Sequence, residues 1–434
     1  MKAQNIPHVA RQWRGVAVLA LLVSNSAMPA LSQEPGFDDV ALVSSRGGQS
    51  PRVAVLTLDR EALFNRLMAQ ERSEHSNASH LSFLDRGLRS SPFRADAASI
   101  SVQLASPAGR ENAKGEEMPA RGRMPRVIEG STLAGLHPVI KSACVVSASV
   151  GPEGLRARWS GRDATVNTQY WSATKILQAF NLVSLVNARR PGVPLDDMVV
   201  RPAGGGSPTI RVSDLLQDIV SYDAGPGRSN AGAETLGRFF LREQRQAALR
   251  ALTGHAVQFA GAYGGGSLIA RPELATRSGE VIARAPASVG VPGPNLISAY
   301  DLTRVLAMAA WHPHLEESAR LPDAQWHSVQ TVLQAMGHDS ARYLDVAIQS
   351  LGLKGKIAAP VLASKLGFGV SSASGITELT YTAVIQFTDL RHSNRPVRRA
   401  CFSLKGVHSN AVELDARIAV EVTEIVRLLA NERL

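Results

Sequence analysis

The feature that most constrains the fold is the segment 170–186, which reads YWSATKILQAFNLVSLV. From residue 176 onward it contains no glycine or proline, and apolar side chains occupy every side of its helical wheel, which predicts a helix buried all round. Ser172 and Lys175 lie three residues apart at the N-terminal end of this helix, so their side chains share one face. A lysine whose pKa is lowered by burial or nearby cations can take the proton of a serine hydroxyl, and the helix N-terminus favours negative charge on the serine oxygen. The segment therefore predicts a serine nucleophile with a lysine base, although Ser-x-x-Lys also occurs by chance in many chains.

The charge of the chain favours a solvated surface over a nucleic-acid-binding one. The 434 residues carry a net charge of +10, and 44% of them are hydrophobic, which is ample for a core. The basic residues are mostly arginines, only eight are lysines, and they form no dense basic run. We therefore expect no nucleic-acid partner. No Cys/His cluster has the spacing of metal ligands, and we expect neither a metal nor a cofactor.

The N-terminal part of the chain has the features of a secretory leader. Basic residues precede a nine-residue apolar run and small residues follow it, so residues 1–32 predict a signal peptide and an exported protein, periplasmic or secreted. This run is too short to span a membrane, and no later segment is long and apolar enough to do so. Residues 33–130 predict a low-complexity or weakly ordered region, with an ordered, partly helical island at 53–70 and linker or disorder from 73 to 122. A composition change then starts the main domain, 131–434.

The main domain alternates strand and helix signals in an order typical of an α+β fold. Two strands joined by a tight turn come first, then the buried helix, a mostly helical block, three strands and a final helix. That order predicts one discontinuous sheet with helices packed against it. The strands are expected at 139–150, 155–160, 361–369, 380–387 and 399–404, and the later helices at 212–220, 229–236, 298–306 and 414–429.

At this point the chain resembles the penicillin-recognising serine hydrolases, most nearly the class A β-lactamases. That family carries the motifs S-x-x-K, S-D-N and K-T-G. The first is intact from Ser172 to Lys175, and the third appears as Lys365-Leu366-Gly367 on a strand after the helical block. The resemblance covers about residues 131–434. It implies a β-lactamase/transpeptidase-like fold, in which an antiparallel five-stranded sheet is formed by the N- and C-terminal parts of the domain and a helical subdomain is inserted.

The second motif is degraded, and two alignments compete for it. Ser229-Asn230-Ala231 falls where S-D-N is expected and is followed by a family-like helix. Ser221-Tyr222-Asp223 is the competing alignment, without the downstream match. In the favoured alignment the Ser229 hydroxyl relays a proton to the leaving group and Asn230 contacts the substrate. In the alternative interpretation Ser229 only caps the next helix.

The resemblance also implies a glutamate that activates the deacylating water, and this chain lacks it at the expected position. The stretch 271–275 is the only one similar to the loop that carries this glutamate. It places Arg271 at the position of the glutamate and Ala275 at that of a partner asparagine. Glu273 is expected to be an ordinary surface residue. Without that base, the acyl-enzyme should be long-lived.

The function implied by the resemblance is an exported serine hydrolase that forms an acyl-enzyme on Ser172. Lys175 is the base, Lys365 pairs with a substrate carboxylate near Gly367, and the Ser172 backbone N–H supplies half of an oxyanion hole. The expected reaction is hydrolysis of a β-lactam amide with slow deacylation. The alternatives are a D-alanyl-D-alanine carboxypeptidase or endopeptidase acting on peptidoglycan stem peptides, and a non-catalytic relative that binds cell-wall peptides.

The two cysteines provide a test of this fold. In the resembled family the strands that carry Cys144 and Cys401 are neighbours in the sheet, so a disulfide is allowed if their Cα atoms lie within about 4.4–6.8 Å. The alternative is two buried, unpaired thiols.

Overall fold

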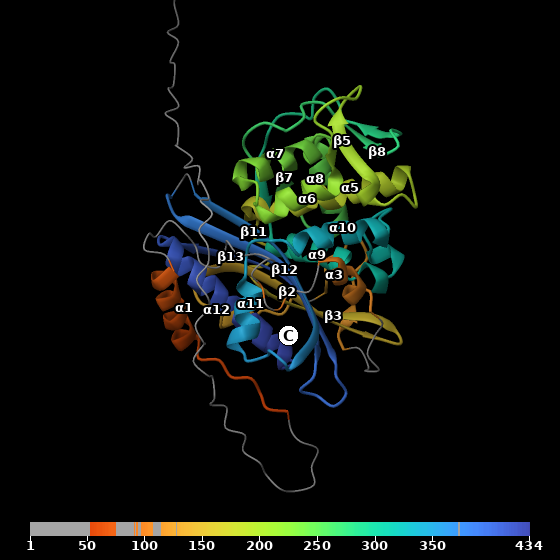
Figure 1. Ribbon diagram of the computed structural model, residues 1–434. Coiled ribbons are helices and arrows are strands. Elements are labelled where there is room, and N and C mark those ends of the chain that lie inside the picture. The colour runs from red at the N-terminus through yellow and green to blue at the C-terminus, as the bar shows by residue number, and fades with distance from the viewer. Residues whose placement is uncertain are drawn as a thin grey trace, which may run out of the picture. The chain divides into compact units, whose positions relative to one another are not determined.

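The centre of the protein, in a computed structural model, is an antiparallel sheet built from the N- and C-terminal parts of the domain (Figure 1). The structure describes residues 53–74, 91, 93, 97–106, 114–126, 128–371 and 374–434, within a compact unit from Val53 to Leu434. The strand order is β1-β3-β2-β13-β12-β11. The strands are β1 (Glu116–Glu117), β2 (Ile140–Gly151), β3 (Gly154–Arg162), β11 (Ile357–Val370), β12 (Thr377–Asp389) and β13 (Val397–His408).

The α+β class is confirmed, but the sheet has six strands rather than the expected five. The additional strand, β1, pairs with β3 through Glu116↔Ala157 and Glu117↔Arg156. A strand of two residues has no alternating pattern that the sequence could reveal. The five long strands confirm the predicted ones, and they bury side chains on both faces: Val146 of β2 faces one apolar core, and its neighbour Val145 faces the other.

Helices cover both faces of the sheet (Figure 1). One face packs against α1 (Arg60–Glu74), α11 (Tyr343–Ser350) and α12 (Ala411–Ala430). The other packs against α9 (Ala299–Ala310), every residue of which is buried. Its start is capped, because Ser298 and Asp301 each accept a hydrogen bond from the other's backbone N–H.

A largely helical block lies between β3 and β11 in the chain, as predicted. Its remaining helices are α5 (Lys175–Arg189), α6 (Val212–Ser221), α7 (Gly225–Gly237), α8 (Arg242–Thr253) and α10 (Trp326–Met336), with short 3-10 turns η1 (Trp171–Thr174), η2 (Leu195–Asp197), η3 (His312–His314) and η4 (Glu317–Ala319). Two small sheets accompany them, with orders β4-β10-β7 and β6-β5-β8-β9. Their strands are β4 (Thr168–Gln169), β5 (Met198–Pro202), β6 (Ile210–Arg211), β7 (Gln258–Phe259), β8 (Pro272–Thr276), β9 (Val281–Arg284) and β10 (Asn295–Ile297).

Parts of the region 33–130 pack into the same unit as the main domain. Helix α1 inserts Leu63 and Leu67 beside α12, at the predicted helical island. The expectation of linker or disorder from 73 to 122 is wrong for α3 (Ala97–Leu104), which buries Ile100 and Leu104 in the core next to α10. Because α3 is only eight residues long, its hydrophobic periodicity covers too few turns to be recognised in the sequence between polar segments. A further short helix, α4 (Ser131–Ala134), precedes β2. The predicted signal peptide, 1–32, lies outside the described residues.

The two cysteine-bearing strands are neighbours, as expected, but the thiols are not bonded. In the β13–β2 register, Cys401 lies opposite Val146 and Cys144 opposite Ser403. The two cysteines are thus two register positions apart on one face, and such diagonal pairs lie about 7–8 Å apart, beyond the reach of a disulfide. Both are buried, free thiols.

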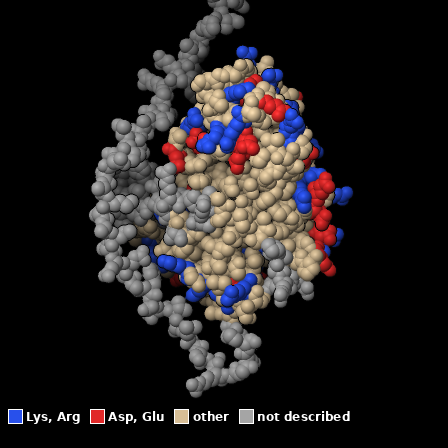
Figure 2. Space-filling model, turned by 45° about the vertical axis from the view of Figure 1, so that its right-hand side comes forward, with Lys and Arg blue, Asp and Glu red and all other residues tan. Residues whose placement is uncertain are grey.

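Basic and acidic side chains are interspersed on the face of the molecule shown in Figure 2, rather than gathered into a patch of one sign. Among the described residues, no helix has both the length and the apolar character that crossing a membrane requires.

Candidate active site

The predicted nucleophile lies on a tight turn that leads directly into the buried helix. Ser172 is the second residue of η1, and Lys175 is the first residue of α5. Ser172 is half-buried, whereas Lys175 is fully buried, together with Ile176 and most of the residues that follow. The apolar residues that predict the helix therefore also remove the lysine amine from water.

The Lys175 amine is held by two residues of α7. Its Nζ donates to Ser229 Oγ at 2.8 Å and to Asn230 Oδ1 at 2.7 Å. The Ser229 hydroxyl in turn donates to the carbonyl oxygen of Ile219 at 2.7 Å. Ser229 is fully buried in the interior of α7, so it is not the cap of that helix, as the alternative interpretation had it.

A second lysine approaches from β11 and meets a tyrosine. Lys365 Nζ donates to the Tyr222 hydroxyl at 2.7 Å and to the carbonyl oxygen of Leu366 at 2.7 Å, and it stands 3.9 Å from the centre of the Tyr222 ring. The Ser172 side chain is hydrogen-bonded to the same tyrosine. Tyr222 therefore connects the nucleophile with Lys365. We call this group the Ser172 cluster: Ser172, Lys175, Tyr222, Ser229, Asn230 and Lys365.

Burial strongly disfavours charge on both lysines of the cluster. Desolvation, with a smaller repulsion from Lys365, lowers the pKa of Lys175 to about 6. Desolvation lowers the pKa of Lys365 to about 7, against a partial increase caused by the Asp339 carboxylate. Burial raises the pKa of the Tyr222 hydroxyl well above its usual range, so this group is protonated at neutral pH. A neutral Lys175 that donates two N–H groups keeps a lone pair to accept a proton.

Gly367 brings β11 close to the nucleophile turn. A Cβ atom at this position would lie 2.7 Å from the carbonyl oxygen of Tyr170 and 2.8 Å from the backbone nitrogen of Ala173. Thr380 of β12 fastens the same turn by donating to the Tyr170 carbonyl at 2.8 Å. The glycine of the Lys-x-Gly motif is thus required here for close backbone packing.

Tyr222 is the main member of the cluster that the sequence did not single out. It occurs in the competing alignment Ser221-Tyr222-Asp223, but its neighbours give no further match there. It ends α6 in the left-handed region, with φ +59°, which turns the chain and sends its ring toward Lys365. Tyr263 also enters the site, with its ring centre 5.7 Å from Lys175 Nζ.

Glu273 is not the surface residue that the sequence suggested. It is buried on β8, where its carboxylate pairs with Arg201 at 2.8 Å and Arg284 at 3.2 Å. Burial alone would raise its pKa, but hydrogen bonds from Arg201, the Gly204 N–H and Arg284 hold the pKa below the usual range. Ala275 lies on the same strand, opposite Val199. Glu273 therefore has the contacts of a structural ion pair.

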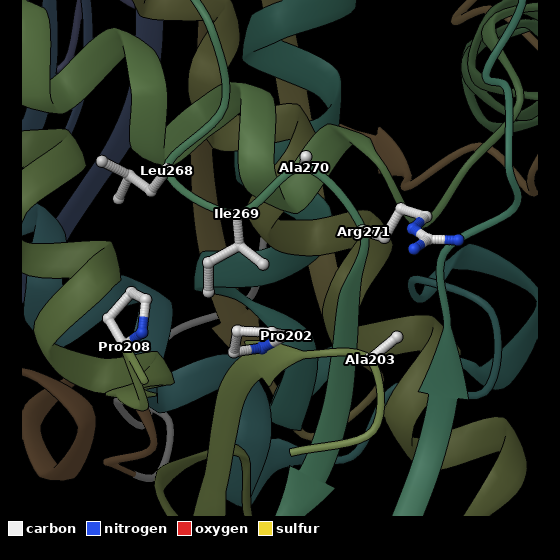
Figure 3. Close-up of a pocket in the computed structure, with 7 residues that line it drawn as sticks. All are labelled: Pro202, Ala203, Pro208, Leu268, Ile269, Ala270 and Arg271. Carbon is white, nitrogen blue, oxygen red and sulfur yellow. The ribbon is translucent and has the colours of Figure 1, made fainter. Parts of the chain in front are cut away.

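A surface hollow of about 270 Å³ lies beside the helical block, and it contains no member of the Ser172 cluster (Figure 3). Its single charged side chain is Arg271, and the rest of its lining is apolar: Pro202, Ala203, Pro208, Leu268, Ile269 and Ala270. Hydrogen bonds from Leu268 N to Ala231 O and Thr235 Oγ1 tie this lining to α7. We place the candidate active site at the Ser172 cluster, because the predicted nucleophile and the predicted base meet the hydroxyl groups of Tyr222 and Ser229 and a second lysine there. Within the described residues, no group of three His, Cys, Asp or Glu side chains has the arrangement of a metal site.

No protein-family model matches the chain, and no curated protein sequence does either. A solved class A β-lactamase from Mycobacterium abscessus is similar with a TM-score of 0.38 and 14% identity, over 65% of this chain and 92% of that one. A β-lactamase from Burkholderia vietnamiensis is similar with a TM-score of 0.41 and 13% identity, over 70% and 98%. One from Xanthomonas campestris pv. campestris has a TM-score of 0.38 and 14% identity, over 69% and 94%. Likenesses at this level establish neither a family nor an activity, so the function below rests on the geometry of the cluster.

Proposed function

We propose that the protein is a serine hydrolase that acts by acyl transfer through Ser172, with a β-lactam amide as its substrate, and that it works after export. The observation that carries this proposal is the contact between the Ser172 hydroxyl, the Tyr222 hydroxyl and Lys365. The Lys175 amine lies 5.4 Å from the centre of the Tyr222 ring and has a pKa of about 6. A serine reacts with an acyl group only when a nearby base can take its proton, and an amine that is neutral at pH 7 is such a base.

The reaction requires two proton transfers, and the cluster has a group for each. Ser172 Oγ attacks the acyl carbon, its bond to that carbon forms, and its proton passes to the lone pair of Lys175. The bond to the leaving group then breaks, and the leaving nitrogen takes the phenolic proton of Tyr222. The ammonium form of Lys365, which is present at neutral pH because its pKa is about 7, replaces that proton. The proton that Lys175 gained from Ser172 balances the one that Lys365 gives up, so the charge of the site is unchanged. Ser229 and Asn230 hold the Lys175 amine in place. The relay predicted for Ser229 is therefore assigned to Tyr222, because the Ser229 hydroxyl is buried and donates to Ile219.

Hydrolysis of the acyl-enzyme should be the slow step. The carboxylate nearest in sequence to the expected deacylating position, Glu273, is committed to two arginines. Asp339, close to Lys365, accepts a hydrogen bond from Ser364 at 2.7 Å. With both carboxylates engaged, Lys175 is the one base of the cluster left to activate water, and without a dedicated carboxylate the acyl group should persist on Ser172.

Intact-mass spectrometry of the purified protein after incubation with a penicillin tests the proposal. We expect one adduct that maps to Ser172, is absent in Ser172→Ala and decays slowly after the penicillin is removed. A fluorophosphonate, which phosphonylates activated serines, is the companion probe. Labelling by the fluorophosphonate but not by penicillin would replace the β-lactam by another acyl substrate, such as a D-alanyl peptide. Labelling by neither would refute the enzyme and favour a non-catalytic peptide binder.

A further inference from the structure

The residue immediately before the nucleophile has a backbone conformation that non-glycine residues rarely adopt. Trp171 has φ +46°, in the left-handed region. Bulky residues occupy this region at a cost in free energy, and they stay there only when the surrounding structure holds them. Because Trp171 and Ser172 share a peptide bond, a change in the backbone angles of Trp171 would move the backbone of Ser172 and its hydroxyl with it.

The indole of Trp171 is held from the sheet. Its Nε1–H donates to Glu378 Oε2 on β12 at 2.8 Å. The ring lies against the backbone of Gly369 on β11, where a Cβ atom would stand 2.5 Å from three ring atoms. The hydrogen bond and the bare glycine together fix the position of the ring.

The Glu378 carboxylate is itself fixed by an ion pair on the neighbouring strand. Lys405 Nζ of β13 lies 3.0 Å from Glu378 Oε2 and donates to Thr168 Oγ1 at 2.8 Å. The two charged side chains are only 14% and 6% exposed, so solvent screens their attraction less than it would at the surface. Thr168 belongs to the short strand β4, just before the nucleophile turn, so Lys405 ties both the carboxylate and the approach to the turn to β13.

We propose that Glu378 and Lys405 are positioning residues for Ser172, which act through the indole of Trp171 and keep the nucleophile turn in its left-handed conformation. This inference rests on the proposed function, since it assigns a role to residues that would touch neither the substrate nor the reacting atoms. It predicts that loss of the carboxylate slows the attack by Ser172 while binding of the acyl compound is unchanged.

Saturation kinetics of Ser172 labelling by a fluorophosphonate separate these two effects. In Glu378→Gln, a maximal labelling rate about tenfold to a hundredfold below wild type, with an unchanged half-saturation concentration, is expected, because misplacing a reacting group by about 1 Å costs up to about a hundredfold. Lys405→Met and Trp171→Phe should lower the same rate constant. Since Glu378 acts through its hydrogen bond with the Trp171 indole, Trp171→Phe combined with Glu378→Gln should be no slower than Trp171→Phe alone.

A matched control distinguishes positioning from general stability. Glu424 pairs with Arg427 at 2.7 Å with side chains 12% and 16% exposed, far from the cluster on α12. Glu424→Gln removes a comparable ion pair and should leave the labelling rate unchanged.

Equal labelling of Glu378→Gln and wild type would overturn the positioning role while leaving the proposed function intact. The same holds if the losses from Trp171→Phe and Glu378→Gln multiply, or if Glu424→Gln is as slow as Glu378→Gln. If neither penicillin nor the fluorophosphonate labels the wild-type protein, the proposed function is refuted. The positioning role then falls with it, because Ser172 would not be a nucleophile.

Discussion

Replacing Lys175 by methionine should stabilise the protein at neutral pH, by an amount that shrinks as the pH rises. Lys175 is fully buried and has a pKa of about 6, whereas an exposed lysine in the unfolded chain has a pKa of about 10.4. Between these values the unfolded chain binds a proton that the folded protein does not. The contribution of Lys175 to stability therefore rises with pH across this window and is lost as the pH falls through it, by about 1.4 kcal/mol per pH unit.

The size of the effect follows from the width of that window. At pH 7 the unfolded chain gains about 5 kcal/mol from protonating this lysine, and at pH 9 only about 2 kcal/mol. Methionine has no proton to gain on unfolding, so this stabilisation of the unfolded chain is lost. The substitution also removes the hydrogen bonds to Ser229 and Asn230, which together contribute about 1–3 kcal/mol. Lys175→Met should therefore be more stable than wild type by about 2–4 kcal/mol at pH 7 and close to wild type at pH 9.

Urea unfolding of wild type and Lys175→Met at pH 7, 8 and 9 measures the difference in the free energy of unfolding. Lys141→Met is the control, because Lys141 is an exposed lysine on β2. A stability difference between Lys175→Met and wild type that stays constant from pH 7 to pH 9 would show that folded Lys175 keeps its proton, and the neutral base would have to be abandoned.

Four further outcomes are expected. The rate of Ser172 acylation should fall as the pH drops through about 6, because Lys175 then gains a proton; stopped-flow acylation that stays flat from pH 8 to pH 5 would exclude Lys175 as the base. Tyr222→Phe should slow acylation about a hundredfold or more in the mass-spectrometric assay, and wild-type rates would remove it from the mechanism. Gly369→Ala should displace the Trp171 ring and cost about 1–3 kcal/mol in urea unfolding as well as slowing acylation, and a neutral result would mean that the ring moves aside freely. Glu273→Gln should lower stability by about 3–5 kcal/mol yet leave the lifetime of the acyl-enzyme unchanged, whereas a longer lifetime would identify it as the deacylating base.

Local patterns in the sequence were sufficient for the elements that carry a strong period. The apolar run after Lys175 predicted a buried helix, and α5 is one. Each of the five long strands overlaps its predicted range, since a run of apolar residues bounded by turn signals identifies a strand wherever it lies in space. The Ser172–Lys175 spacing and the Lys365-x-Gly367 motif identified residues that the fold brings to one turn and the strand beside it.

Tertiary structure alone decided which other side chains join them. Tyr222 reaches Lys365 because α6 ends in a left-handed residue, and a backbone angle at one helix end leaves no trace in hydrophobic periodicity. Glu273 can be buried because Arg201 of β5 and Arg284 of β9 pair with its carboxylate. Contacts between separate strands cannot be predicted from the local sequence. The two cysteines are offset by two positions in the register between β2 and β13. The register of two strands far apart in the sequence is fixed only when the sheet forms. The lowered pKa of Lys175 likewise depends on the residues that bury its amine, and these residues come together only in the folded chain.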